Sequence, residues 1–323
     1  MITTLVYRDT RLAAHNPSPD TLATLRHEPG VMLWVDLCGP SEEEIKLVLE
    51  TTFGFHPLAI EDCVTDSPFP KFEEYEDYLY LVMHAVDDAQ TQRFSTTEID
   101  LFIGRNFLVS FHRKPLRPVQ AAIDRCLRNP STPVRGPDRF AHTLLDLMVE
   151  AYQPVLTALR RELEEIEEGV LRDMPAAQMF PRVAGLRKRF SALRQIVRPQ
   201  REITASLSSG TIKLIRPVIV PYLRDLTEDL NRIETQASAW ADQLILSFRV
   251  YLNKSHHEAN TGIRVITAIT ALTIPVTLVS SWWGMNFERM PELSSRFGYL
   301  GAWALTLSGT VAILFYLRRR NWI

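Results

Sequence analysis

Hydroxyl and amide side chains recur at a regular spacing within an otherwise apolar stretch near the end of the 323-residue chain. Counting back from Ser281 in steps of four and three residues reaches positions that share one side of a helix. Their oxygens could hydrogen-bond a hydrated ion in a pore, or the small side chains could simply let helices pack closely. The spacing alone leaves both interpretations open. The stripe contains Asn260, Ile263, Thr267, Thr270, Ile274, Thr277 and Ser281.

The stripe extends into the first of two apolar runs, Val265–Trp283 and Tyr299–Leu317, which contain no charged residue and no histidine. Each run has about 19 residues, so as a helix it would be about 28 Å long, close to the hydrocarbon thickness of a bilayer. In lipid the backbone must satisfy its own hydrogen bonds, so helices are expected. The sequence therefore predicts a membrane protein with two spans. Two spans cannot enclose a channel, so a pore requires several copies in a ring.

The short segment between the two runs offers groups that could meet a cation. Gly284 permits a tight turn, and Asn286 supplies an amide next to it. For a cation that keeps its water, an amide oxygen could bind the hydration shell rather than the bare ion. Asn286 could instead cap the end of the first helix. Further on, Glu288 and Glu292 could attract cations, although Arg289 partly offsets them.

Basic residues near the runs predict the orientation of the chain. The charges within residues 287–298 cancel, whereas the two outer flanks are basic. Because positive flanks stay on the cytoplasmic side, both termini are expected in the cytoplasm of an inner or plasma membrane. The flanking basic residues are Lys254, Arg264, Arg318, Arg319 and Arg320.

The first part of the chain, residues 1–136, predicts an α/β domain. Ser41 and Glu44 form a capping-box signature, so a helix is expected to begin there. Strand-like runs and a hairpin around Gly104 are predicted from apolar patterning and turn residues. The expected strands are Thr3–Tyr7, Val31–Leu37, Tyr78–Val86, Ile99–Ile103 and Phe107–Phe111, and a helix is expected at Pro115–Arg128.

Long helices are predicted after Pro137, and residues 137–260 are expected to form a cytoplasmic helical and stalk region before a two-span domain, 261–323. From Pro221 to Trp283 a single helix would be roughly 90 Å long. An acidic run at Glu162–Glu168 is interpreted as a solvated face rather than a cation site.

Composition excludes several function classes. The net charge of −2 gives no reason to expect a nucleic-acid partner. Cys38, Cys63 and Cys126 are widely spaced, which favours reduced thiols over disulfides or a zinc site. No nucleophile with its base and no phosphate loop is recognisable, so neither an enzyme nor an organic cofactor is expected. No apolar run follows Met1, so no cleavable signal peptide is expected.

Several motifs together resemble the CorA family of divalent-cation transporters. The family's hallmark is the tripeptide Gly284-Met285-Asn286 between two C-terminal spans, here preceded by Pro275 and followed by Met290-Pro291-Glu292-Leu293. Two cytoplasmic stretches are also similar to the family, Phe53–Asp62 with Pro70-Lys71-Phe72, and Val220–Asp225. The resemblance implies an α+β membrane protein with an N-terminal α/β cytoplasmic domain, long stalk helices and two C-terminal transmembrane helices.

The resemblance also implies a homo-oligomer, a pentamer in the family, with Gly284, Met285 and Asn286 as the selectivity filter. Glu61 and Asp62 would bind regulatory Mg²⁺ opposite Asp225 of the next subunit, although they could instead only cap or solubilise a short helix. Arg160 and Arg161 stand where acidic residues are expected, with Glu164 and Glu165 close by, so a second regulatory site is doubtful. The positions that match the family's pore lining are Asn260, Ile263, Ile266, Thr270, Ile274, Thr277 and Ser281, with apolar constrictions at the isoleucines.

The function expected from these features is passive influx of hydrated Mg²⁺, gated by cytoplasmic Mg²⁺, through a ring of copies in the lipid membrane. Co²⁺ and Ni²⁺ could also pass, because recognition of a hydrated ion discriminates weakly between them. A zinc transporter of the ZntB branch shares Gly-Met-Asn, but Met290–Leu293 favours magnesium. The alternative from another class is a membrane-anchored scaffold or sensor that transports nothing.

Overall fold

The chain forms two compact units. The computed structural model describes residues 1–86, 95–128, 136–286, 297–320 and 322. Contacts group the chain into an N-terminal unit, Met1–Leu246, and a C-terminal unit, Ser247–Ile323. The three-part division at residues 136 and 260 stays a prediction.

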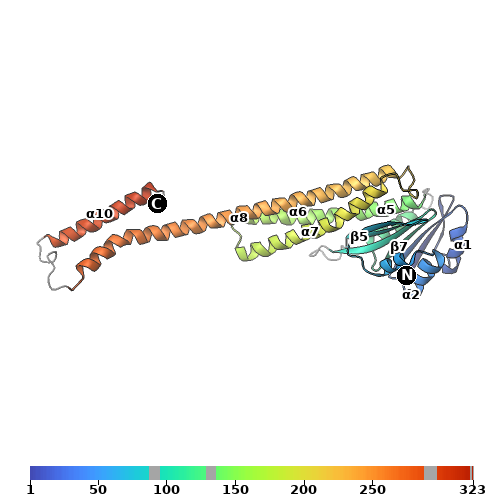
Figure 1. The fold of residues 1–323 in the computed structure, drawn as a ribbon, viewed down its shortest axis with the longest axis horizontal. Helices are drawn as coiled ribbons and strands as arrows, with labels where there is room; N and C mark the ends of the chain where they lie inside the picture. Colours follow the sequence, from blue (N-terminus) through green and yellow to red (C-terminus); the bar gives the residue numbers. More distant parts are fainter. Residues whose placement is uncertain (87–94, 129–135, 287–296, 321, 323) are drawn as a thin grey trace. The chain divides into compact units, whose positions relative to one another are not determined.

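A seven-stranded sheet is the centre of the N-terminal unit (Figure 1), with the strand order β2-β1-β3-β7-β6-β5-β4. Only β3 and β7 run parallel among these paired strands, with Leu33 opposite Phe107. All predicted strands are confirmed, whereas the short edge strands β2 and β4 were not expected. The strands are β1 (Ile2–Arg8), β2 (Arg11–His15), β3 (Val31–Cys38), β4 (Lys71–Glu74), β5 (Tyr78–Val86), β6 (Thr96–Gly104) and β7 (Phe107–His112).

Helices cover both faces of the sheet, which explains why successive residues of its central strands β3, β6 and β7 are buried on both sides. On one face, Val35 and Phe102 belong to a buried cluster that includes Val48 and Ala59 of the covering helices. On the other face, the Trp34 ring lies 5.5 Å from the ring of Phe140. The helices on the face of Val35 and Phe102 are η1 (Pro19–Thr21), α1 (Leu22–His27), α2 (Glu42–Ile45), the π-helix η2 (Lys46–Thr52) and α3 (Pro57–Val64).

The predicted capping box is present at the start of α2. Ser41 Oγ accepts from the Glu44 N–H at 3.2 Å, and Glu44 Oε2 accepts from the Ser41 N–H at 2.9 Å. The following turns widen into η2, where the Phe53 N–H reaches the Val48 carbonyl at 3.0 Å. After η2 the chain enters α3, whose first residue is Pro57, a position where proline is favoured.

Helices α4 to α8 follow the sheet strands. Long helices were predicted after Pro137, and in this region α5 and α6 are two separate helices. Pro154 explains the break, because its ring would clash with the carbonyl of Glu150 in a continuous helix. The helices are α4 (Arg117–Arg128), α5 (Pro137–Glu150), α6 (Tyr152–Leu171), α7 (Ala176–Leu207) and α8 (Val220–Trp283).

The acidic run on α6 joins this helix to its neighbours. Glu162 forms an ion pair with Arg189 of α7, and its side chain is only 24% exposed. Glu165 accepts from Arg182 at 2.6 Å, again on α7. The interpretation of this run as a solvated face is therefore wrong at Glu162, because helical spacing also turned part of the run toward basic α7.

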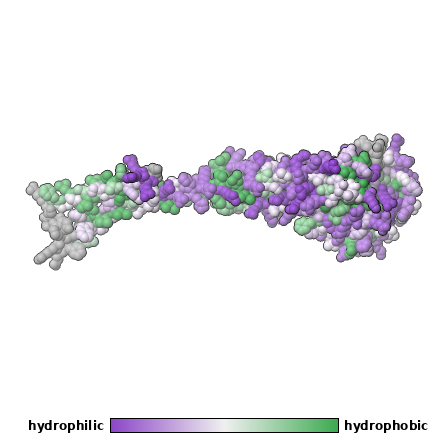
Figure 2. Space-filling model, turned by 45° about the horizontal axis from the view of Figure 1, so that its top comes forward, coloured by the Kyte–Doolittle hydropathy of each residue, from purple (hydrophilic) through white to green (hydrophobic). Residues whose placement is uncertain are grey.

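The C-terminal unit contains the end of α8 and the helix α10 (Gly298–Arg319), and both predicted spans are confirmed as helices. Both helices are long and apolar enough to cross a membrane. Figure 2 shows hydrophobic side chains over their surfaces, and Ile266 is 67% exposed and Phe315 68%. Such exposure is stable when lipid rather than water surrounds the helices.

Candidate ion pathway

The residues predicted to line a pore are all exposed along one stripe of α8 within the C-terminal unit. The α8 stripe is defined as Asn260, Ile263, Ile266, Thr270, Ile274, Thr277 and Ser281. Exposure on a single chain leaves this face available for neighbouring copies, lipid or a water-filled passage.

The threonines of this span point their hydroxyl hydrogens back at the helix. Thr270 Oγ1 donates to the Ile266 carbonyl at 2.9 Å, and Thr277 Oγ1 lies 3.0 Å from the Ile274 carbonyl. A hydroxyl has one hydrogen and two lone pairs, so a hydroxyl that donates to the backbone still accepts from outside. The exposed stripe therefore presents hydrogen-bond acceptors between apolar isoleucine side chains.

The opposite side of the first span packs against α10. A Cβ added to Gly309 of α10 would lie 3.1 Å from Pro275 Cβ, so the two helices approach closely there. Ala268 of α8 and Leu317 of α10 are also buried, at 3% and 4% exposed. Small residues at the contact permit such close packing in membranes. The helix pair thus leaves the α8 stripe uncovered.

The residues predicted to form a filter, Gly284, Met285 and Asn286, follow the last turn of α8. The Gly284 N–H donates to the Ser280 carbonyl at 2.9 Å, and the Met285 N–H to the Trp282 carbonyl at 3.3 Å. Asn286 is exposed, and its amide makes no hydrogen bond to the described residues. Asn286 is not among the described non-glycine residues with positive φ, so it does not form the left-handed cap that the alternative interpretation requires. Glu288 and Glu292 lie outside the described residues.

The predicted regulatory carboxylates lie in the N-terminal unit. Asp62 on α3 forms an ion pair with Lys71 of β4, whereas Glu61 and Asp225 are exposed. Within the described residues of one chain, no group of three or more His, Cys, Asp or Glu side chains is placed to hold a metal ion. A site shared between neighbouring chains stays a prediction.

Two acidic residues behind α3, the buried Asp100 and the half-buried Glu98, were missed in the sequence. Burial raises the pKa of Asp100 well above its usual range, although its carboxylate accepts from Tyr80 Oη at 2.6 Å. Burial also raises the pKa of Glu98, whose carboxylate accepts from the Ser67 N–H at 2.7 Å. The strand at Ile99–Ile103 was predicted, but the sequence does not indicate that α3 covers the side of the sheet on which Glu98 and Asp100 lie.

The fold, with an α/β unit, a long helix and two apolar helices, defines a two-span membrane protein. The sequence matches the family model described as CorA-like Mg2+ transporter protein over residues 29–319, and the chain belongs to that family.

Two curated relatives cover most of the chain. The "Putative metal ion transporter YfjQ" of Bacillus subtilis is 28% identical over 290 residues, which cover 90% of this chain and 89% of that protein. The "Cobalt/magnesium transport protein CorA" of Thermotoga maritima is 27% identical over 296 residues, which cover 90% and 83%.

A solved structure has the same fold over nearly its whole length. The complete CorA magnesium transporter of Methanocaldococcus jannaschii superposes with a TM-score of 0.81 at 18% identity, covering 99% of this chain and 98% of that chain. The predicted fold class is thereby confirmed.

Proposed function

We propose that copies of this chain form a channel for hydrated divalent cations, with Mg²⁺ as the main ion, and that α8 lines it. The observation that carries this proposal is the α8 stripe, which is exposed, rich in hydrogen-bond acceptors and leads to the exposed amide of Asn286. Influx would be passive and driven by the electrochemical gradient.

The acceptors suit an ion that keeps its water. Mg²⁺ holds its hydration shell tightly, and the water hydrogens of that shell point outward. Thr270 and Thr277 can accept these hydrogens because their own hydrogens are used in the helix. The oxygen of the Asn286 amide can do the same at the outer end.

The isoleucines suit the role of a gate. Ile263, Ile266 and Ile274 are 61%, 67% and 49% exposed in the single chain. If copies bring them together around an axis, the apolar ring empties of water when it narrows and blocks ions. Mg²⁺ bound between Glu61 and Asp62 of one chain and Asp225 of the next would hold that ring closed.

The names of relatives support the ion class. The Thermotoga maritima relative is named for cobalt and magnesium, so we include Co²⁺ among the transported ions. In the proposal the assembly is a pentamer in the inner or plasma membrane. Both termini would lie in the cytoplasm, because the basic residues Arg318 and Arg319 follow the second span.

The test is uptake of Mg²⁺ and Zn²⁺ into proteoliposomes that contain wild type or Asn286→Ala. We expect wild type to carry Mg²⁺ in preference to Zn²⁺, and the variant to lose flux by about tenfold or more. A lost hydrogen bond to a charged species costs about 1.5–3 kcal/mol. Asn253→Ala, an exposed asparagine of α8 before the apolar run, is the matched control and keeps wild-type flux. Equal flux in wild type and Asn286→Ala would leave only the scaffold or sensor function, and faster Zn²⁺ uptake would favour the zinc transporter.

A further inference from the structure

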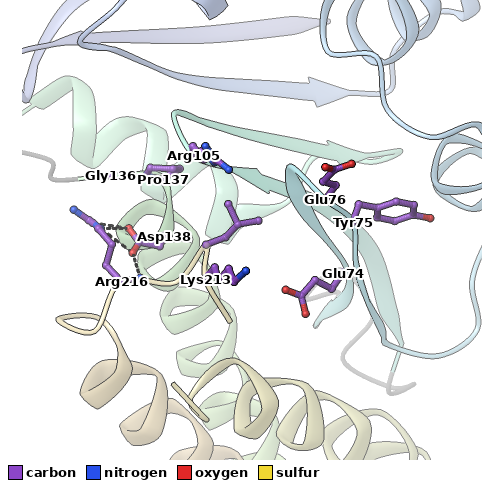
Figure 3. A pocket seen from close by; sticks show the side chains of 10 residues that line it. Glu74, Tyr75, Glu76, Arg105, Gly136, Pro137, Asp138, Lys213 and Arg216 are labelled. Atoms are coloured by element: carbon purple, nitrogen blue, oxygen red, sulfur yellow. Dashed lines mark hydrogen bonds and ion pairs between the residues drawn. The ribbon is translucent and has the colours of Figure 1, made fainter. Parts of the chain in front are cut away.

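A cavity of about 670 Å³ lies within the N-terminal unit and has no role in the proposed ion pathway. Four separate parts of the chain line it: the β4–β5 turn, the β6–β7 turn, the start of α5 and the segment between α7 and α8 (Figure 3). Its volume falls within the range of 300–1,000 Å³ that is usual for small-molecule sites.

The walls of this cavity carry unpaired charges of both signs. Glu74 and Glu76 come from the β4–β5 turn, whereas Arg105 and Lys213 come from two other segments. All four side chains belong to exposed residues, and none forms an ion pair or hydrogen bond with the described residues. Within the described ranges of the chain, the cavity therefore offers a ligand two carboxylates and two cations that have no partner.

A third cation, Arg216, is held rigidly at the edge of the cavity. Its Nε donates to Asp138 Oδ2 at 2.9 Å and its Nη2 to Asp138 Oδ1 at 2.5 Å, and the Asp138 side chain is only 2% exposed. A Cβ added to Gly136, whose φ is 145°, would lie 2.6 Å from Arg216 Cζ. The guanidinium thus packs directly against the backbone, and its Nη1 makes no hydrogen bond to the described residues.

We infer that this cavity binds a phosphate chain in complex with Mg²⁺, either inorganic pyrophosphate or the triphosphate of a nucleotide. Arg105, Lys213 and Arg216 contact the phosphate oxygens, while Glu74 and Glu76 hold the ion or its water.

The acidic and the basic side chains of the cavity together favour a complex of phosphate with Mg²⁺ over either component alone. A phosphate chain alone would be repelled by Glu74 and Glu76, because like charges in a partly enclosed site repel strongly. The two carboxylates alone are too few for a metal site made by protein side chains, and no such group of three or more exists among the described residues. Mg²⁺ is commonly bound through one or two carboxylates together with phosphates. In such a complex the ion would contact the carboxylates of the cavity and the phosphates would contact its cations.

The test is isothermal titration of the full-length protein in detergent with pyrophosphate and with ATP, each with and without Mg²⁺, after subtraction of heats from Mg²⁺ alone. Both Arg105→Ala and Lys213→Ala should weaken Mg²⁺-dependent binding about tenfold or more, since each removes a charged contact worth about 1.4 kcal/mol or above. Glu74→Gln combined with Glu76→Gln should abolish the enhancement by Mg²⁺. The matched control is Lys46→Ala, which removes an exposed lysine of η2 and leaves the affinity unchanged.

The outcomes separate the possible ligands and the two proposals. Equal affinity for pyrophosphate and ATP identifies the phosphate chain as the ligand, and tighter binding of ATP identifies a nucleotide. Absence of binding by both, equal binding without Mg²⁺, or wild-type affinity in Lys213→Ala overturns the inference. Asn286→Ala should bind as wild type does, and Lys213→Ala should keep wild-type Mg²⁺ uptake in ligand-free proteoliposomes, so failure of either proposal is recognised separately.

Discussion

The proposed choice of cations over anions can be understood from single hydroxyl groups. Thr270 and Thr277 have committed their only hydrogens to helix carbonyls, so they meet the surroundings as acceptors. Water bound to a cation turns its hydrogens outward and needs acceptors, whereas water bound to an anion turns its oxygens outward and needs donors. A passage lined in this way favours hydrated cations without any fixed negative charge in the membrane.

At the same scale, Asp100 predicts how stability depends on pH. Because its pKa is raised in the folded protein, Asp100 keeps its proton to a higher pH there than in the unfolded chain, where an Asp pKa is near 3.9. The contribution of Asp100 to stability is therefore complete below about pH 4 and is lost as pH rises toward the folded-state pKa. Asn resembles the protonated carboxyl, so Asp100→Asn should be more stable than wild type at neutral pH.

Chemical unfolding of the purified protein at several pH values measures this effect. The stability gap between Asp100→Asn and wild type should widen by up to about 1.4 kcal/mol per pH unit above pH 4. Asp9→Asn is the control, because Asp9 is exposed and its left-handed φ of 50° suits Asn. A gap that stays constant with pH would show that Asp100 is not protonated in the folded state.

At the scale of elements, the contact between α8 and α10 depends on Gly309. Because an added Cβ would already lie 3.1 Å from Pro275, Gly309→Leu should force the two spans apart. Overpacking of this kind costs about 1–3 kcal/mol. The melting temperature of the purified protein in detergent should fall.

Gly301→Leu provides the matched control on the same helix. A Cβ at Gly301 meets no heavy atom of the described residues within 4 Å, so the same side chain should be accepted there. Equal melting temperatures of the two variants would contradict close packing of α8 on α10 at Gly309.

Local signals predicted most elements of this fold. The capping box at Ser41, the hairpin around Gly104 and the two uncharged runs each depend on neighbouring residues, and all three are confirmed. The edge strand β2, Arg11–His15, carries a weak apolar pattern because most of it is exposed, so it was missed. The break before α6 was also missed, although Pro154 marks it.

The candidate sites were predictable to different degrees. Most of the α8 stripe could be predicted because helical spacing places its members on one side, whereas Ile266 was included because of the resemblance to the family. The cavity at Arg216 could not, because Glu74, Arg105, Asp138 and Lys213 are brought together only by the folded sheet and helices. The regulatory site depends on a second chain, so one sequence and one chain leave it a proposal.

At the scale of the whole molecule, the uncovered α8 stripe makes assembly a requirement of the proposed function. A single helix pair exposes Thr270 and Thr277 and cannot surround an ion. In the proposed assembly, carboxylates of the N-terminal units would meet across chain boundaries, where Asp225 of one chain would repel Glu61 and Asp62 of the next. Loss of bound Mg²⁺ would separate the chains, and binding would draw them together.

Mg²⁺ should therefore protect the N-terminal unit from trypsin. Exposed basic residues such as Arg187 and Lys188 of α7 are available to the protease, and cleavage rates report local opening. With Mg²⁺ at about ten times its dissociation constant, the open population and the cleavage rate should fall about tenfold for each linked site. Asp225→Asn should remove this protection, whereas Glu228→Gln, one turn further along α8 and also exposed, should retain it. Identical digestion of wild type with and without Mg²⁺ would rule out regulation by ions between chains, while leaving the α8 pathway to be judged by flux alone.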